Sequence, residues 1–500
     1  MRNNKTTSFL VVLIVPLLVS CSVFPGWGEP EIDHVVLADP ADPLEVPANV
    51  GSVGWTWSSP EGTSVRHVSP TSYGLSVYVS DGVIGVSGET GEELWRYRRL
   101  GEKATSMNIT PDGETVVVSY SAHEKETEGE EEPPPIHEVV LLDASTGEIR
   151  GGQVVEFAHM PFDGSGPSSY ASGNEKLGVL SNDSRIIYRD HESGGGEVVS
   201  LGLGNDEELW SVSPGQRGGG EERYFVARNS VFSRGVLIVS SSFVDESVLE
   251  PGGLSGVKDH TLALIGLDIE TGSELWRHEV EVNAGIDLTP FDFGVEPNSG
   301  MVAAAARGSD YQEEWLLDPV TGEVLADADF FTGESGTAFG ILEEAIVSVR
   351  STSEGGGSGS LEELEEREYE HEYSYSDLSG EVQHSVTVPA SEPLDRSRGS
   401  FTLALEESIA WLDVNERNTD ELSWNPAQLV VTDWDSGESR VIDLGVEVQR
   451  RPDNDGPRGV VPALGPPPES MLLAPGALVI TEDPSKEEYE SPRRLVGLVP

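Results

Sequence analysis

Short apolar runs that alternate with polar turns dominate the chain after residue 48. Runs such as 75–80, 138–143, 235–242 and 428–434 are rich in Val, Ile, Leu and Tyr, and Gly, Asp, Asn or Pro separates them. This pattern is typical of β-strands joined by tight turns, whereas apolar spacing of helical period is scarce. The pattern therefore predicts an all-β fold over residues 49–500.

One turn motif recurs seven times in this region. In each copy a Thr or Ser immediately precedes a Gly, and in five copies an Asp lies four residues before that Gly. Two further copies, at Gly91 and Gly380, have Ser87 and Ser376 at the Asp position. The copies follow one another at intervals of roughly 50 to 60 residues, with one longer gap, which indicates an internal repeat. The five Asp copies are Asp143 with Gly147, Asp190 with Gly194, Asp268 with Gly272, Asp318 with Gly322, and Asp433 with Gly437.

The stretch LDIETGSELWRHEV, residues 267–280, is the clearest copy. Gly272 can adopt the positive φ of a tight turn, and the side chains of Asp268 and Thr271 can bond the backbone amides of the turn. A four-stranded sheet of this length cannot bury both faces alone, so neighbouring copies must stack, as in a β-propeller. We expect residues 53–62 to supply a strand that closes the C-terminal blade. Eight four-stranded blades are predicted, and seven is the alternative.

The repeat resembles that of the quinoprotein-type β-propellers, in which an Asp-x-x-Thr-Gly turn is followed four residues later by a Trp. Trp276 and Trp95 occupy that place after Gly272 and Gly91, and the resemblance implies that they wedge between blades. Dehydrogenases of this family hold pyrroloquinoline quinone and calcium at the axis, often beside a vicinal cysteine pair. This chain has a single cysteine and no local cluster that supplies an ion site. We therefore expect neither quinone nor calcium and assign no catalytic or metal-binding residue.

The N-terminus has the order of a bacterial lipoprotein signal. Arg2 and Lys5 precede an apolar run that ends at Cys21, and Leu18-Val19-Ser20-Cys21 resembles a lipobox. The resemblance implies a signal peptide over 1–20 and lipid attachment at Cys21; an ordinary signal peptide is the alternative. Residues 21–48 lack periodicity and are predicted to form a flexible tether. The expected location is the extracytoplasmic face of the cell membrane.

The charge of the chain argues against nucleic acid as a partner. The formal charge is −57, and loss of residues 1–20 removes two bases and no acid, which makes it −59. Such a surface repels phosphate backbones. The stretch 452–456 begins like a calcium loop but lacks the later ligands.

The sequence thus favours a monomeric, lipid-anchored propeller that binds proteins as a scaffold and has no catalytic activity. The repeat is also similar to that of propeller lipoproteins that act as scaffolds. A quinone-dependent dehydrogenase is one alternative. Another is a sugar- or peptide-binding sensor, in which insertions at 121–138 and 352–374 form one rim.

Overall fold

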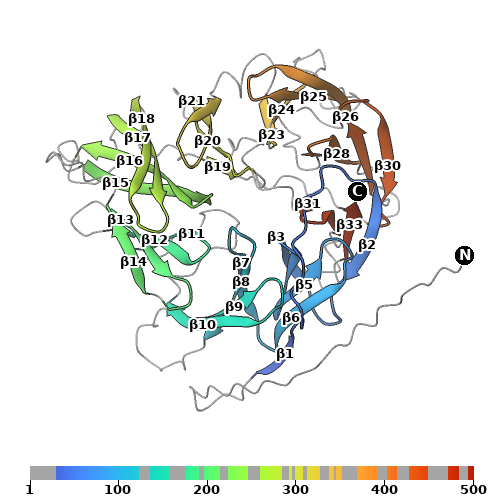
Figure 1. The fold of residues 1–500 in the computed structure, drawn as a ribbon, viewed down its shortest axis with the longest axis horizontal. Helices are drawn as coiled ribbons and strands as arrows, with labels where there is room; N and C mark the ends of the chain where they lie inside the picture. Colours follow the sequence, from blue (N-terminus) through green and yellow to red (C-terminus); the bar gives the residue numbers. More distant parts are fainter. Residues whose placement is uncertain are drawn as a thin grey trace, which may run out of the picture.

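The computed structural model is an eight-bladed β-propeller with 33 strands in its described part. Eight antiparallel sheets stand side by side around a common axis (Figure 1). The prediction of an all-β fold with eight blades is confirmed, and the seven-bladed alternative is wrong. The structure describes residues 30–122, 136–156, 175–190, 196–205, 207–213, 223–245, 259–283, 292–295, 299–307, 312–326, 337–342, 345–351, 369–390, 402–413, 427–446, 448, 471–482 and 494–500.

The first four blades each contain four consecutive strands, in an order that runs from the first strand to the fourth. Blade 1 has β3 (Val65–Thr71), β4 (Gly74–Val79), β5 (Gly82–Ser87) and β6 (Glu93–Leu100). Blade 2 has β7 (Ala104–Ile109), β8 (Thr115–Ala122), β9 (Ile136–Asp143) and β10 (Ile149–Glu156). Blade 3 has β11 (Glu175–Leu180), β12 (Ser184–Asp190), β13 (Gly196–Gly202) and β14 (Glu208–Val212). Blade 4 has β15 (Arg223–Ser233), β16 (Val236–Asp245), β17 (Asp259–Asp268) and β18 (Glu274–Asn283).

The next three blades repeat this order, and the last blade combines the two ends of the chain. Blade 5 has β19 (Asp292–Val295), β20 (Val302–Arg307), β21 (Gln312–Leu317) and β22 (Val324–Ala326). Blade 6 has β23 (Thr337–Ile341), β24 (Ala345–Ser351), β25 (Tyr369–Asp377) and β26 (Val382–Ala390). Blade 7 has β27 (Thr402–Ala404), β28 (Ser408–Asp413), β29 (Gln428–Asp433) and β30 (Ser439–Asp443). Blade 8 has β31 (Met471–Ala474), β32 (Ala477–Thr481), β33 (Arg494–Val499) and β2 (Ser52–Ser58).

The ring closes through the pairing of β2 with β33. The two strands run antiparallel from Ser52 opposite Val499 to Ser58 opposite Arg494. An N-terminal strand therefore completes the C-terminal blade, as the sequence predicts for residues 53–62. Closure of this kind gives β33 a partner on its second side, so β33 does not form a free sheet edge.

The hydrophobic core lies between the blades. Each of the eight junctions has its own cluster of buried side chains from two neighbouring sheets. At the junction of blades 1 and 2, for example, Tyr78 and Trp95 pack with Met107. The second and third strands have buried side chains on both faces, and every residue of β4 is buried. Packing on two faces explains why these strands read as continuous apolar runs.

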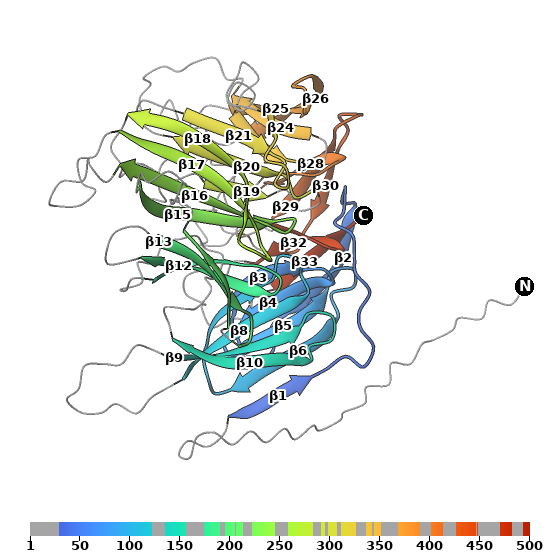
Figure 2. The same cartoon turned by 60° about the vertical axis from the view of Figure 1, so that its left-hand side comes forward.

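A fifth strand, β1 (Glu31–Val35), lies against the outer edge of blade 1. It pairs antiparallel with β6 over five residues, from Glu31 opposite Leu100 to Val35 opposite Arg96 (Figure 2). The side chain of His34 also donates a hydrogen bond to the carbonyl of Gly147 in blade 2, at 2.8 Å. The predicted tether therefore includes a strand of the first sheet.

Residues 30–51, which we call the N-terminal strap, connect four blades. Backbone hydrogen bonds join Leu37 to Thr146 in blade 2, Leu44 to Ser72 in blade 1, Glu45 to Gly476 in blade 8, and Ala48 to Glu407 in blade 7. For residues 30–48 the prediction of a flexible tether is wrong. After β1, residues 36–51 show no strand periodicity because their partners are separate turns rather than one continuous strand.

The two faces of the ring have different connections. In each antiparallel blade, the first-to-second and third-to-fourth turns leave from one face, where the strap binds, and the other connections leave from the opposite face. Residues 123–135 and 352–368, most of the two predicted insertions, lie outside the described residues. Among the residues that the structure describes, no helix has the length and apolar character needed to cross a membrane.

Candidate functional site at the blade junctions and outer strands

The turn at 268–272 is held by its own aspartate. The amide of Gly272 donates to the carbonyl of Asp268 at 2.8 Å. Both the amide and the hydroxyl of Thr271 donate to Oδ1 of Asp268, at 2.9 and 2.7 Å. Gly272 has a φ of 69°, which a residue with a side chain adopts only with strain. These bonds use the carboxylate to shape the turn.

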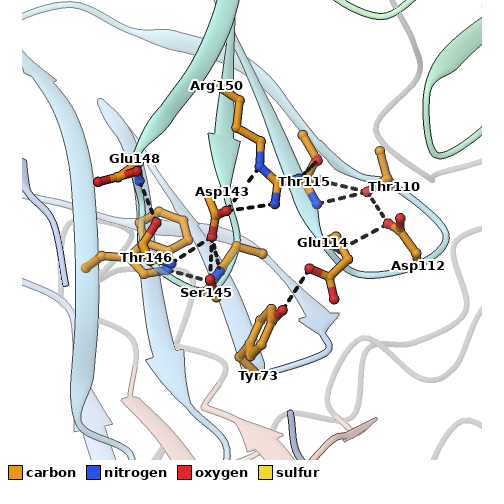
Figure 3. A network of polar contacts seen from close by, with 12 residues as sticks. Tyr73, Thr110, Asp112, Glu114, Thr115, Asp143, Ser145, Thr146, Glu148 and Arg150 are labelled. Atoms are coloured by element: carbon orange, nitrogen blue, oxygen red, sulfur yellow. Dashed lines mark hydrogen bonds and ion pairs between the residues drawn. The ribbon is translucent and has the colours of Figure 1, made fainter. Parts of the chain in front are cut away.

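The equivalent turn of blade 2 adds an arginine. The amides of Ser145 and Thr146 donate to Oδ1 of Asp143 at 2.8 and 2.9 Å, and Nε and Nη2 of Arg150 donate to its Oδ2 at 3.1 and 2.7 Å (Figure 3). Nη1 of Arg150 donates to Oγ1 of Thr115 on β8 at 2.7 Å. The carboxylate of Asp143 thus ties the turn of blade 2 to a neighbouring strand of the same sheet.

These bonds set the acidity of the turn aspartates. Burial alone would raise the pKa of Asp143, but hydrogen bonds from Ser145 and Arg150 lower the pKa below its ordinary value. The same balance, with backbone donors at Thr321 and Val320, lowers the pKa of Asp318. Hydrogen bonds from Ser436 lower the pKa of Asp433. Each of these carboxylates accepts backbone amides of its own turn, so all three act as structural acceptors.

The assignment of Asp190 and Gly194 to the same turn is wrong. Asp190 ends β12, the second strand of blade 3, so the pair belongs to the connection between the second and third strands. Gly194 itself lies outside the described residues. The third-to-fourth turn of this blade is 202–207, in which the amide of Gly202 donates to the carbonyl of Glu207 at 2.8 Å. The sequence misleads because this turn lacks the initial Asp.

In blade 6 the residue that shapes the turn is Asp377 rather than Ser376. The amide and hydroxyl of Ser379 donate to Oδ1 of Asp377 at 2.9 and 2.6 Å, and the amide of Gly380 donates to its carbonyl at 2.9 Å. This turn is one residue shorter than the turn at Asp268. The fixed spacing of four residues therefore selects the wrong neighbour.

Four tryptophans join neighbouring blades in the same way. Their indole N–H groups donate to the carbonyl of the second residue of the next blade's turn. Each ring also lies against a turn glycine: a Cβ on Gly322 would lie 2.5 Å from the ring of Trp276. The pairs are Trp55 with Gly88 at 2.6 Å, Trp95 with Ala144 at 2.7 Å, Trp210 with Ile269 at 2.7 Å and Trp276 with Pro319 at 2.8 Å.

Fixed spacing from the glycine finds Trp95 and Trp276 and misses Trp55 and Trp210. A second signal was present in the sequence, because Glu-Leu-Trp occurs at 93–95, 208–210 and 274–276. In all three strands a β-bulge places the Leu as an extra residue just before the Trp. The bulge turns the Trp toward the next blade, so the tripeptide marks the junction better than the glycine does.

The junction of blades 6 and 7 uses other residues. His384 takes the Trp position, and its Nε2 lies 3.2 Å from Oδ1 of Asp435. Trp434, in the turn of blade 7, packs at a tilt of 53° against Tyr375 with ring centroids 5.7 Å apart, and its indole N–H donates to the carbonyl of Leu405. The other turns place Gly151, Ala326 and Val441 at the Trp position, as the sequence shows.

The basic residues of β6 are fully engaged. Arg98 forms two hydrogen bonds with Asp81, and Arg96 donates to Asp33 on β1 at 2.8 Å. Arg99 donates twice to Glu138 of blade 2 and lies 4.3 Å from the ring centroid of Tyr120. Hydrogen bonds from Arg99 lower the pKa of Glu138. This cluster joins blade 1 to blade 2 and to β1.

The axis of the ring is lined by the first strand of each blade, since the first strands of neighbouring blades contact one another. Among the first-strand side chains that the structure describes, none is Asp or Glu. A search of the described residues finds no group of three or more His, Cys, Asp or Glu placed to hold a metal ion. Cys21 lies outside the described residues.

The outer strands expose aliphatic side chains where they begin. In blades 2 to 6 one large aliphatic residue lies at or next to the bulge of the outer strand. These residues are Ile149 (52% exposed), Leu209 (50%), Leu275 (47%), Val324 (39%) and Val382 (47%). We call them the rim residues.

Comparisons with known proteins assign no family to the chain. No protein-family model matches the chain, and no curated protein matches it. Among solved structures, the chain is similar to a quinohemoprotein alcohol dehydrogenase from Pseudomonas putida, with 10% identity, coverage of 92% of this chain and 78% of that chain, and a TM-score of 0.43. It is also similar to a quinohemoprotein alcohol dehydrogenase from Comamonas testosteroni, with 12% identity, coverage of 90% of this chain and 76% of that chain, and a TM-score of 0.40. For the β-propeller domain of the Trilobed protease from Pyrococcus furiosus the identity is 9%, the coverage is 76% of this chain and 98% of that chain, and the TM-score is 0.31. These similarities assign neither a cofactor nor a reaction to this chain.

Proposed function

We propose that this protein is a lipid-anchored, extracytoplasmic propeller that binds other proteins as a scaffold and has no catalytic activity of its own. The rim residues are the observation that carries the proposal. They lie at or next to the bulge of five outer strands in a chain with 88 acids and 31 bases. Apolar side chains that recur on such a charged surface favour a protein partner.

The distribution of polar bonds supports this role. The turn aspartates, the four junction tryptophans and the arginines of β6 are all occupied with bonds inside or between blades. They make the ring stiff, and a stiff ring presents its circumference in a fixed geometry. Preorganised surfaces lose less entropy when a partner binds.

The strap gives the proposed anchor a defined place on the ring. Glu31 begins β1, ten residues after Cys21 in the sequence. Ten extended residues reach at most about 35 Å, so a lipid on Cys21 would hold the outer edge of blade 1 near the membrane. Cys21→Ser should move the protein from the membrane fraction to the soluble fraction and abolish incorporation of labelled fatty acid. A variant that stays in the membrane fraction would contradict the anchor.

The binding role is tested by photocrosslinking in native membranes. A benzophenone amino acid at Leu209 or Leu275 should give light-dependent adducts with discrete proteins. The same amino acid at Glu61, an exposed position on the opposite face, should not give these adducts. Equal adducts at all three positions, or none at the rim, would refute the proposal.

The dehydrogenase alternative has its own test. The purified protein is mixed with pyrroloquinoline quinone, calcium and an artificial electron acceptor, and alcohols and sugars are offered as substrates. We expect no reduction of the acceptor above the rate without protein. Turnover that depends on the protein would overturn the assignment of a scaffold.

A further inference from the structure

Two outer strands of the ring differ in how their free edges are protected. β18 and β26 are the longest fourth strands, and both carry the bulge before the position of the junction residue, Trp276 or His384. After that position β18 presents Arg277 and Glu279 on one side, whereas β26 presents Ser385 and Thr387 at the equivalent positions. Charged side chains on edge strands discourage pairing with other chains. Strand β18 has this protection, whereas β26 contains no Asp, Glu, Lys or Arg.

The available edge of β26 covers residues 382–388. Among the described strands, none pairs with the side of β26 that faces away from β25. Ser385 and Thr387 are exposed, while Val386 and Val388 are buried on the other face. The edge ends at Pro389, which has no N–H to donate. In an antiparallel sheet, alternate residues of this stretch direct their N–H and C=O groups outward, ready for another strand.

Strand β1 shows what a blade edge of this protein accepts. It adds to β6 as an extended segment, and its Asp33 accepts a hydrogen bond from Arg96 and lies 3.9 Å from Arg98. Arg98 in turn binds Asp81 within the blade. Charges therefore alternate in sign from the sheet to the added strand. Cross-strand pairs of opposite charge stabilise this kind of addition.

The same rule gives the charge of a strand that fits β26. Glu372 on β25 lies opposite Thr387, and Arg350 on β24 lies opposite Glu372 and bonds it at 2.6 Å. Glu370 lies opposite Pro389. An added strand would place its side chains next to Thr387 and one strand further from these glutamates. Arg350 is positive, Glu372 is negative and Thr387 is neutral, so basic side chains at alternate positions of the added strand continue the alternation of charge across the sheet.

We propose that the outer edge of β26 is a strand-addition site for an extended segment of another protein, with basic residues at alternate positions. This inference rests on the proposed scaffold role and names one surface and one partner class for it. A second copy of this chain is a poor occupant, because its charge of −57 repels its like.

The test uses a labelled hexapeptide, acetyl-Thr-Lys-Val-Lys-Val-Thr-amide, with the full chain and fluorescence anisotropy as the readout. Two control peptides have Glu in place of Lys, or N-methyl groups on alternate amides. Ser385→Arg/Thr387→Glu gives β26 the residues of β18 at exposed positions, and should weaken binding by about tenfold or more. Circular dichroism checks that this variant folds.

Binding that both controls lose, that Ser385→Arg/Thr387→Glu weakens and that protects amides 384–388 from hydrogen exchange would establish the site. Equal binding of the N-methylated peptide, or of wild type and this variant, would overturn it. Dimers that form in sedimentation and vanish in the variant would also overturn it, since the occupant would be a second copy. Crosslinks at Leu209 and Leu275 without peptide binding would reject this site and leave the scaffold role intact. Peptide binding without those crosslinks would establish the site on β26 and reject the binding role of the rim residues.

Discussion

The glycine of the repeated turn has two separable roles, and two positions of this chain allow each to be measured. Gly272 and Gly437 have nearly the same backbone conformation, with φ of 69° and 67°. A Cβ on Gly272 would lie 2.6 and 2.8 Å from two ring atoms of Trp210, whereas a Cβ on Gly437 would have no atom of the described residues within 4 Å. Substitution by Ala thus strains the backbone in both cases and crowds a neighbour in only one.

The two costs have different sizes. A residue with a Cβ in the left-handed region loses about 1–2 kcal/mol, and this is the whole effect expected for Gly437→Ala. Gly272→Ala should lose the same amount plus about 1–3 kcal/mol for overpacking against a ring held between blades. The expected free energies of unfolding therefore differ by about 1–3 kcal/mol between two chemically identical substitutions.

Urea unfolding followed by circular dichroism measures both variants. A double-mutant cycle with Trp210→Ala isolates the contact, since that substitution removes every ring atom near Gly272. In the Trp210→Ala background, Gly272→Ala should cost no more than Gly437→Ala, which gives a coupling energy of about 1–3 kcal/mol. Equal costs of the two glycine substitutions in the wild-type background would refute the reasoning.

Three further predictions follow from the same contacts. Trp95→Phe leaves the buried carbonyl of Ala144 without its donor and should lower the free energy of unfolding by about 1–3 kcal/mol in urea titrations. Asp143 has a lowered pKa, so the stability that it contributes is present above the ordinary carboxyl pKa and is lost as pH falls through the lower folded value. The stability difference between wild type and Asp143→Asn, measured by urea unfolding at several pH values, should therefore shrink below about pH 4. A chain that begins at residue 49 loses the backbone bonds of the strap, each worth about 1 kcal/mol, and should have a lower thermal midpoint; an unchanged midpoint would show that the strap is not bound.

The sequence predicts the fold well because the repeat is local. Asp268, Thr271 and Gly272 lie within five residues, and their hydrogen bonds close within the same turn. The spacing of Asp, Thr and Gly in the sequence therefore predicts these hydrogen bonds directly. It fails where the turn changes length, as at Asp377, or loses its Asp, as at 202–207. A fixed spacing then selects a residue that has the right type and lies at the wrong end of the blade, as Asp190 does.

The rest of the candidate site depends on contacts that spacing does not encode. Trp210 binds a carbonyl 59 residues away, and Leu37 binds the turn of a neighbouring blade. A strand edge such as that of β26 becomes visible only when the order of strands in the sheet is known. Its lack of charge is plain in the sequence, but the sequence does not say that this strand is the outer one.

The N-terminal segment joins the two ends of the ring in a fixed order along the chain. From residue 30 onward it forms β1 on blade 1, then contacts blades 2, 1, 8 and 7, and only then enters β2 of blade 8. Any pull on a lipid at Cys21 would therefore reach β1 before it reached the closing strand. The five paired residues of β1 would bear this load before β2 and β33 do. The proposed anchor and the closure of the ring are thus mechanically separate, and the strap is the element that separates them.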